Sequence, residues 1–510
     1  MVENLFSSFA AAIAQPDRVF LAPLHREAIN FRRAFDFAGR LAHVLASRGV
    51  RRGDRVVVQV EKSPEAVFLY FACLRLGAIY VPLNPAYTAG EIDYLLADAE
   101  PALFVSTPER EASSRAIFPR GPVLTLGADG KSGSLLAEAK DKPGDFTDAI
   151  VANDDLAAIL YTSGTTGRSK GAMLSHGNLK SNALVLKEFW QFQNTDVLLH
   201  ALPIFHTHGL FVAINVSLAA ASSLIFLPKF DVDEIFRQLP HTSVMMGVPT
   251  FYVRLLADPR LDRAVVRHMR LFVSGSAPLP AEIFTRWQER TGLTLLERYG
   301  MTETNMNTSN PYFGERKPGT VGIPLPGTEI RIIDDKGDAV PQGEVGMITV
   351  RGPNVFKGYW RMPEKTQGDF QDDGSFVTGD LGRKDRDGYL SIMGRGRDLV
   401  ITGGLNVYPR EVETCLNMVP GVQDSAVFGL PHPDLGEGVT AVVVHNGEGE
   451  LSEAAILASL EERLAKFKRP KRVLFVEEIP RNVMGKVQKN LLQEKYSALY
   501  TGGEAQKPPA

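Results

Sequence analysis

A loop that combines glycine, hydroxyl and lysine side chains runs from Tyr161 to Gly171, with the order Tyr-Thr-Ser-Gly-Thr-Thr-Gly-Arg-Ser-Lys-Gly. Phosphate binding needs backbone N–H groups that can approach closely, hydroxyl donors and a cation, and this loop supplies all three. The spacing of its glycines is not that of a Walker A loop. We expect it to bind nucleotide phosphates, and the alternative is a flexible surface linker of the same composition. The expected phosphate-binding residues are Thr162, Ser163, Gly164, Thr165, Thr166, Gly167 and Lys170.

Alternating helix and strand signals surround this loop. Apolar residues recur at helical spacing from Phe35 to Ala46, and Ser63-Pro64 begins a second helical pattern that Gly77 ends. Short buried strands are expected at residues 55–60, 79–81, 157–161, 224–227 and 271–273. Such alternation is typical of parallel or mixed sheets covered by helices, in which ligands gather at the strand ends. The sequence therefore predicts an α/β fold.

The pattern changes after Thr320. Residues 329–334, 346–350 and 388–392 read as short strands separated by turn residues, which predicts a small antiparallel β subdomain. A charged, glycine-bearing segment follows, and the residues beyond it have helix and strand signals of their own. We predict a large N-terminal domain over residues 1–394, a hinge at residues 395–398, and a small, mobile α+β domain over residues 399–510.

The composition excludes several functional classes. Of the 510 residues, 44% are hydrophobic and 23% are charged, which is ordinary for a globular protein. A net charge of −3 gives no global field to attract nucleic acid or an anionic membrane, so we expect small-molecule substrates, no nucleic acid and no stable membrane association. Cys73 and Cys415 support neither a disulfide framework nor a thiolate metal site, and the N-terminus is a poor signal peptide. A cytoplasmic protein is predicted, whereas the oligomeric state is left open.

The loop at Tyr161–Gly171 is similar to the phosphate loop of the adenylate-forming superfamily, which comprises acyl-CoA synthetases, adenylation domains of peptide synthetases, and luciferases. The resemblance covers essentially the whole chain, because further segments follow in the family's order and at similar spacing. These segments are residues 203–209, 274–278, 299–303, 378–380, 394–398 and 480–486. Ser169 stands where many members have proline, and this leaves the resemblance intact because proline there would only rigidify the turn.

The resemblance implies that ATP activates a carboxylic acid as its acyl-adenylate and that a thiol, coenzyme A, then captures the acyl group. Charge builds up on phosphate oxygens in such a reaction, so fixed cations and donors are the main catalytic resource. Glu303 and Thr166 are implied to bind Mg²⁺, with Thr302 near the α-phosphate. Further implied ATP contacts are Asp380 and Arg395 at the ribose, and Ser276, Ala277 and Tyr299 around the adenine.

Simpler interpretations of these side chains exist. By composition alone Glu303 would be an ordinary exposed acid, and Asp380 with Arg395 a surface ion pair. Lys486 stands in a segment with many cations, where most lysines must be solvated. The order of the motifs favours function in each case.

The resemblance also gives the C-terminal domain its part in the reaction. Lys486 is implied to reach the carboxylate and α-phosphate oxygens during adenylation, which makes Lys486, Thr302 and Glu303 the expected catalytic residues. Arg397 is implied to be the hinge about which the small domain rotates. That rotation would withdraw Lys486 and present Gly403 and Gly404 for the coenzyme A step.

Two arginines near the implied acyl pocket, Arg254 and Arg298, indicate the kind of acid. A buried guanidinium without a partner is expensive, so a cation there favours an anionic ligand group such as the second carboxylate of a short dicarboxylate. Either arginine could instead pair with a neighbouring acid, for example Glu297 or Asp258.

A narrower resemblance points to one acid. Residues 168–173 and 298–311 are similar to the corresponding stretches of bacterial malonyl-CoA synthetases, which implies malonate, with methylmalonate as a close relative. His206 is implied to be a wall of the acyl pocket, together with Gly275 and Met301, whereas His208 has no such support. The pair of histidines has no further ligand at zinc spacing.

Other functions stay open at this point. The acid could be another short, medium-chain or aryl acid, and the acceptor could be a carrier-protein thiol or, in oxidative light emission, oxygen. A non-catalytic nucleotide-binding protein on the same scaffold is a second alternative. Lys486 disfavours it, since a pure binder has no need of that residue.

Overall fold

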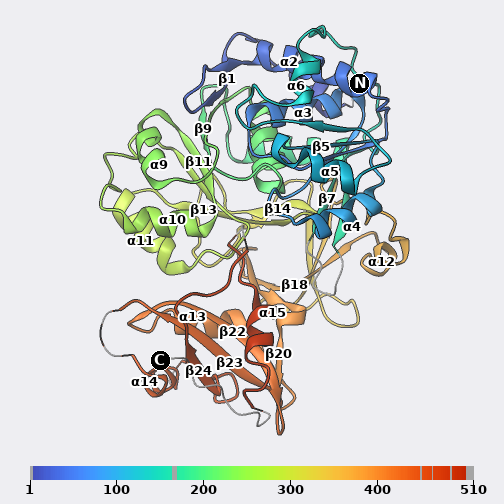
Figure 1. Cartoon of the computed structure of the whole chain (residues 1–510). Coiled ribbons are helices and arrows are strands. Elements are labelled where there is room, and N and C mark those ends of the chain that lie inside the picture. Colours follow the sequence, from blue (N-terminus) through green and yellow to red (C-terminus); the bar gives the residue numbers. More distant parts are fainter. Residues whose placement is uncertain are drawn as a thin grey trace.

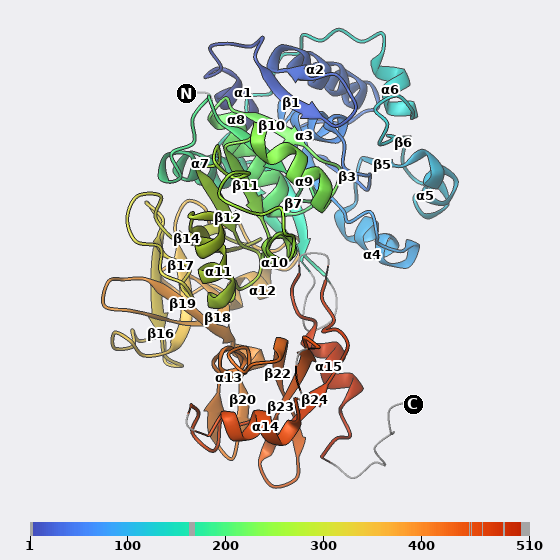
Figure 2. The same cartoon turned by 90° about the vertical axis from the view of Figure 1, so that its left-hand side faces the viewer.

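The structure is a computed structural model that describes residues 4–162, 169–447, 449, 451–461, 463–482 and 485–500. It has a large N-terminal domain and a smaller C-terminal domain, which lies below it in Figures 1 and 2. The hydrophobic cores separate in the same way. Two clusters draw their buried residues only from between Val400 and Leu492, and three others draw theirs from residues up to Leu390. The α/β fold with two domains of unequal size is therefore confirmed.

The strand that leads into the phosphate loop belongs to a six-stranded sheet. Its order is β6 (Val123–Thr125), β5 (Leu103–Ser106), β3 (Arg55–Val58), β4 (Ile79–Pro82), β7 (Leu156–Thr162) and β8 (Lys170–Ser175). Neighbouring strands are parallel except for β7 and β8, which are antiparallel. The loop of residues 162–170 therefore joins two adjacent strands.

A nine-stranded sheet supplies the other strand ends. Its order is β15 (Ile323–Pro324), β14 (Asn305–Ser309), β13 (Leu295–Met301), β12 (Leu271–Ser274), β11 (Val244–Gly247), β9 (Val197–His200), β10 (Ser223–Phe226), β1 (Val19–Pro23) and β2 (Ile29–Asn30). The strands from β13 to β1 pair in parallel. Their carboxyl ends therefore meet at one edge, as the strand pattern predicts.

The predicted β subdomain is an antiparallel sheet of four strands. They are β16 (Glu329–Ile333), β17 (Gly346–Arg351), β18 (Phe376–Lys384) and β19 (Leu390–Arg395). The C-terminal domain has a sheet of its own, with β21 (Leu405–Val407), β20 (Val400–Thr402), β23 (Gly436–His445), β22 (Val422–His432) and β24 (Arg472–Phe475). The one-turn 3₁₀ helix η4 (Gly396–Asp398) connects the two sheets.

Helices cover these sheets. In the N-terminal domain they are α1 (Leu5–Ala10), α2 (Phe31–Ser47), α3 (Pro64–Leu76), α4 (Ala89–Ala99), α5 (Glu111–Ile117), α6 (Ser134–Ala139), α7 (His176–Phe189), α8 (Asn215–Ala219), α9 (Val232–Gln238), α10 (Pro249–Ala257), α11 (Ala281–Thr291) and α12 (Pro363–Gly368). The C-terminal domain contributes α13 (Pro409–Leu416), α14 (Glu453–Ser459) and α15 (Lys489–Lys495). Shorter turns are the 3₁₀ helices η1 (Pro108–Arg110) and η3 (Leu239–His241) and the π-helix η2 (His208–Ile214). Within the described ranges, no helix is both long enough and apolar enough to cross a membrane.

Helix α3 shows how local residues set the bounds of these elements. The Ser63 hydroxyl accepts a hydrogen bond from the Ala66 N–H at 3.2 Å, and Pro64 occupies the first turn, where its missing N–H has no consequence. Gly77 ends the helix with a φ of 71°, a left-handed conformation that favours glycine. These three residues confirm the helix bounds expected from the sequence.

Candidate active site

The predicted phosphate loop begins and ends at paired residues. Thr162 at the end of β7 lies opposite Lys170 at the start of β8. Helix α4 holds both sides of the loop: the Tyr161 hydroxyl donates to Asp98 Oδ2 at 2.5 Å, and the Tyr94 hydroxyl donates to the Ser169 carbonyl at 3.1 Å. The predicted residues Ser163, Gly164, Thr165, Thr166 and Gly167 lie outside the described residues.

The predicted ribose pair is formed between adjacent strands of the β subdomain. Asp380 on β18 and Arg395 at the end of β19 are register partners, with 3.2 Å between Asp380 Oδ1 and Arg395 Nε. The Tyr299 hydroxyl donates to Asp380 Oδ2 at 2.6 Å, so the carboxylate is held from both sides. Asp380 raises the pKa of Arg395, and burial raises that of Tyr299. Three residues expected around the nucleoside therefore meet at one carboxylate.

The turn after β12 carries Ser276 and Ala277, which are expected at the adenine. Ser276 has a φ of 71°, a left-handed conformation that is uncommon for a residue other than glycine. Its Oγ lies 3.2 Å from His208 Nδ1. Strained backbone of this kind clusters at ligand sites, which agrees with the predicted place of the turn.

Glu303 is the predicted metal ligand, and its surroundings fit a cation. The side chain is buried, the Tyr359 hydroxyl donates to its Oε1 at 3.1 Å, and burial raises its pKa. In the described part of the chain no lysine or arginine pairs with it. The same residues contain no group of three or more His, Cys, Asp and Glu side chains that could hold a metal. A hard cation such as Mg²⁺, which takes one or two carboxylates together with phosphate oxygens and water, fits this donor set.

Arg298 lies on β13, one residue before Tyr299, and is 3% exposed. Among the described residues, its Nε and Nη2 have no hydrogen-bond partner, and burial lowers its pKa to about 9. A Cβ on Gly275 would lie 2.4 Å from the Arg298 Cζ, so only glycine leaves room for the guanidinium there. Met301 is the last residue of this strand and Thr302 follows it in a turn, and both residues are half-buried.

The acids considered as partners of the two arginines are engaged elsewhere. Glu297 Oε1 accepts from the Leu279 N–H at 2.9 Å, and burial raises the pKa of Glu297 to about 7. Asp258 pairs with Arg260 at 2.7 Å. Arg254 is exposed on α10, and no described ion pair involves it, so its predicted role stays a prediction.

Two histidines stand beside Arg298. His206, the predicted wall residue, is half-buried, and burial together with Lys486 and Arg298 lowers its pKa to about 3. His208 is 1% exposed, and its Nε2 has no partner among the described residues. Burial and Arg298 hold the pKa of His208 well below its usual range. The sequence analysis gave His208 no role, although it lies two residues after His206, and the structure places both histidines near Arg298.

Lys486 approaches these residues from the C-terminal domain. In both views the segment just before α15 extends up to the N-terminal domain (Figures 1 and 2). Asn482 Oδ1 accepts from the Lys486 N–H at 3.0 Å, and Gly485 turns the chain with a φ of 74°. A Cβ on Gly485 would lie 3.4 Å from Thr250 Cγ2 on α10, so the turn fits closely against the N-terminal domain.

Lys486 is exposed to solvent, yet protein atoms surround its ammonium group. This crowding lowers its pKa, Arg395 acts in the same direction, and Asp380 and Glu303 oppose the shift. The lysine is thus close enough to interact with the ribose pair and with the predicted metal ligand. The structure brings these predicted residues together from both domains.

The predicted hinge and coenzyme A residues lie in the connection and the C-terminal domain. Arg397 in η4 lies 3.4 Å from Asp398, measured from Nε to Oδ1. Gly403 and Gly404 form the exposed turn between β20 and β21, with φ of 57° and 78°, and the Gly403 N–H donates to Leu435 of the same domain. Their roles stay predictions.

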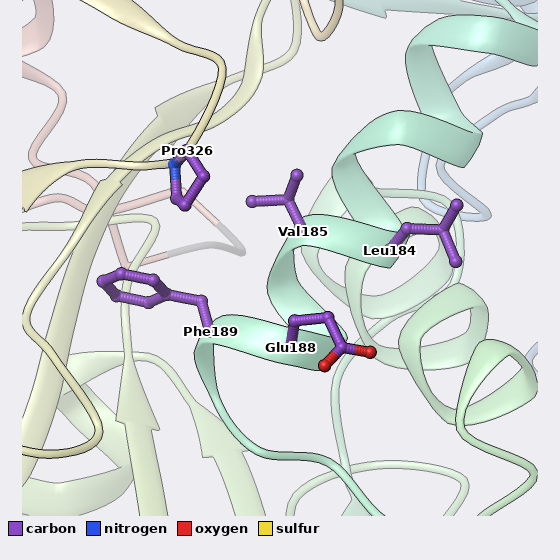
Figure 3. A pocket seen from close by; sticks show the side chains of 5 residues that line it. All are labelled: Leu184, Val185, Glu188, Phe189 and Pro326. Carbon is purple, nitrogen blue, oxygen red and sulfur yellow. The ribbon is translucent and has the colours of Figure 1, made fainter.

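One hollow lies apart from these residues. It has a volume of about 450 Å³ and lies against α7 and Pro326, and Figure 3 shows Val185, Phe189 and Pro326 turned toward one another there. No predicted site residue lines it. Its apolar wall is unsuited to phosphate.

Known proteins resemble this chain over most of its length. Residues 9–360 match the family described as AMP-binding enzyme, and residues 411–486 match the AMP-binding enzyme C-terminal domain. The crystal structures of MatB from Rhodopseudomonas palustris are 54% identical and cover 98% of this chain and 100% of theirs. Their TM-scores are 0.97 with ATP bound and 0.86 for the apo protein.

Two curated relatives differ in the acid they are named for. A malonate–CoA ligase of Arabidopsis thaliana is 36% identical over 486 residues, which is 88% of this chain and 78% of that protein. A feruloyl-CoA synthase of an Amycolatopsis species is 37% identical over 462 residues, which is 90% of this chain and 92% of that protein. Similarity at this level leaves the acid open.

Proposed function

Since this chain belongs to the AMP-binding enzyme family and is an ATP-dependent, AMP-forming acid–thiol ligase, we propose that its acid is malonate and its thiol is coenzyme A. In the first step a malonate carboxylate attacks the α-phosphate of ATP, and pyrophosphate leaves. In the second step the sulfur of coenzyme A attacks the acyl carbon of malonyl-AMP, its proton is lost to solvent, and AMP leaves.

The surroundings of the buried Arg298 guanidinium are the main support for malonate as the acid. Its Nε and Nη2 form one edge of the guanidinium, and both lack a partner among the described residues. That edge matches the two oxygens of a carboxylate, which gives a bidentate, charge-assisted pair. A fatty or aryl acid would leave the buried charge uncompensated, whereas the second carboxylate of malonate would neutralise it.

His208 supports the same choice. Because the imidazole is neutral, it offers one donor and one acceptor, and its Nδ1 faces the Ser276 hydroxyl at 3.2 Å. If the hydroxyl donates to Nδ1, Nε2 carries the proton and can donate to a ligand oxygen. A pocket with a guanidinium edge and an imidazole N–H therefore suits a short, polar acid.

The chain's own groups would act on the first step as follows. Lys486 would donate to the attacking carboxylate and the α-phosphate oxygens, and Lys170 would hold the outer phosphates. Asp380 would accept from the ribose hydroxyls, with Tyr299 and Arg395 fixing its orientation. Glu303, with Thr166 as the second predicted ligand, would hold Mg²⁺, which supplies charge neutralisation on the phosphates when bound.

The second step would follow a rotation of the C-terminal domain about Arg397. The rotation would move Lys486 away from Asp380 and Glu303 and bring the Gly403–Gly404 turn toward the acyl-adenylate. A glycine turn without side chains leaves room for the thin chain that carries the thiol of coenzyme A.

The choice of acid is tested by comparing kcat/KM for malonate, methylmalonate, acetate, octanoate and ferulate, with acyl-CoA and AMP measured by chromatography. We expect malonate to be preferred. The kcat/KM for methylmalonate should be within roughly 10- to 200-fold of that for malonate, because one methyl group in a pocket changes the free energy by about 1–3 kcal/mol. A preference for octanoate or ferulate would contradict the proposal.

The ribose assignment gives a second prediction. Asp380→Asn should weaken ATP binding about tenfold or more, because the charged acceptor of the ribose hydroxyls is lost. Binding of 2′,3′-dideoxy-ATP, which lacks those hydroxyls, should change far less, as measured by calorimetry. Asp385→Asn is the control, because the Asp385 carboxylate pairs with Lys317 at 2.9 Å instead. This variant should bind both nucleotides normally. An equal loss for both nucleotides would argue against the ribose contact.

A further inference from the structure

Tyr359 lies where two predicted ATP-handling groups meet. Its hydroxyl donates to Glu303 Oε1 at 3.1 Å, and Lys170 Nζ lies 4.4 Å from the centroid of its ring. The side chain is 3% exposed, so one buried residue contacts both the predicted metal ligand and the predicted phosphate lysine. None of the motifs found in the sequence includes it.

The backbone around Tyr359 is tied to the same two groups. Tyr359 forms a β-bridge with Ala172 on β8, the strand that Lys170 begins, and the Trp360 N–H donates to the Gly171 carbonyl at 2.7 Å. The Phe356 N–H donates to the Glu303 carbonyl at 2.8 Å. The segment from Phe356 to Trp360 therefore runs from Glu303 to the base of the phosphate loop.

We propose that Tyr359 is a positioning residue that fixes Glu303 and Lys170 relative to each other for binding of ATP with its divalent cation. The inference rests on the proposed ATP-dependent reaction but is independent of which acid is used.

Each half of the side chain has its own physical effect. The hydroxyl engages one oxygen of the Glu303 carboxylate, which orients the other for a cation. The electron-rich ring face attracts the Lys170 ammonium, in surroundings where burial lowers the pKa of that lysine. Removing the hydroxyl alone should therefore weaken binding of the cation, whereas removing the ring should also weaken binding of the ATP phosphates.

The two effects separate in ATP-binding measurements by calorimetry, made once with EDTA and once with saturating Mg²⁺. The ratio of the two dissociation constants is the gain in affinity due to Mg²⁺. In Tyr359→Phe the affinity in EDTA should stay within about twofold, while the gain should fall about tenfold, as for a hydrogen bond to a charged group. In Tyr359→Leu the affinity in EDTA should fall as well, by about threefold or more.

Tyr389 provides a matched control in the β subdomain. Its hydroxyl donates to the Glu315 carbonyl at 2.7 Å, and Lys317 Nζ lies 4.4 Å from its ring centroid. Tyr389→Phe should leave both affinities unchanged.

Two outcomes would overturn the role of Tyr359. The first is a Tyr359→Phe protein that matches wild type in both conditions, and the second is an equal loss of affinity with and without Mg²⁺. If Tyr359→Leu does not fold, the phenylalanine variant decides alone, because it preserves the ring. Failure of the wild-type protein to bind ATP would instead overturn the proposed function, so the two failures are distinguishable.

Discussion

Lys486→Ala is expected to lose formation of malonyl-AMP from ATP and malonate while keeping transfer from supplied malonyl-AMP to coenzyme A. The lysine interacts with Arg298, Asp380 and Glu303 in this arrangement of the two domains, so its charge lies beside the residues proposed to bind ATP and the acid. Removing one such donor lowers a rate by roughly 10²- to 10³-fold. Malonate-dependent exchange of pyrophosphate into ATP measures the first step, and malonyl-CoA formed from synthetic malonyl-AMP measures the second.

The second step should stay within about threefold of wild type, because the proposed rotation removes Lys486 before the thiol attacks. Lys495→Ala is the control: this lysine is exposed at the end of α15 in the same domain. It should leave both steps unchanged. Loss of both steps in Lys486→Ala would show that the residue does not act on adenylation alone, and loss of neither would remove it from catalysis.

Arg298→Met should lower kcat/KM for malonate by about 10²- to 10³-fold, since it removes the proposed partner of the second carboxylate. Activity with acetate, which has no second carboxylate, should fall little or rise. The selectivity between the two acids is therefore the informative quantity, measured as the ratio of their kcat/KM values. An unchanged ratio would contradict the dicarboxylate pocket.

Although Arg298→Met should lower activity with malonate, it should not lower the stability of the protein. Arg298 Nε and Nη2 are buried without a partner in the part of the chain that the structure describes, which costs free energy. Arg298→Met should therefore unfold at the same temperature as wild type or at a higher one in the absence of ligands. Arg316→Ala is a control of the other kind, because Arg316 donates to the Pro311 and Thr294 carbonyls at 3.1 and 2.8 Å. It should lower the unfolding temperature without changing acid selectivity. A large loss of stability in Arg298→Met would instead show that the arginine holds the fold.

Strand geometry explains one choice that the sequence analysis left open. Glu297 precedes Arg298 directly and was a possible partner for it. Successive side chains of a strand point to opposite faces of the sheet. Glu297 therefore meets the Leu279 N–H on one side, and Arg298 lies on the other side, where the acyl pocket is predicted. The alternation of a strand would have excluded this pairing if residues 295–301 had been predicted as a strand, but the sequence analysis did not predict one there.

Local signals were sufficient for several elements of the N-terminal domain. The bounds of α3 follow from Ser63, Pro64 and Gly77, whose effects act within one helical turn. The antiparallel β subdomain followed from strands separated by turn residues, which is also a short-range pattern. The π-helix η2 was not predicted, because no local residue pattern identifies one.

The sequence by itself determined the order of the motifs, the α/β class and the chemistry available to each loop, because these depend on residue type and short spacing. Only the tertiary structure decided which side chains meet. Tyr299 and Asp380 are 81 residues apart, and Tyr359 and Glu303 are 56 residues apart. That Arg298 Nε and Nη2 have no hydrogen-bond partner among the described residues is likewise a property of the folded chain. Burial and hydrogen-bond pairing depend on segments that approach only after folding, so no local pattern could report them.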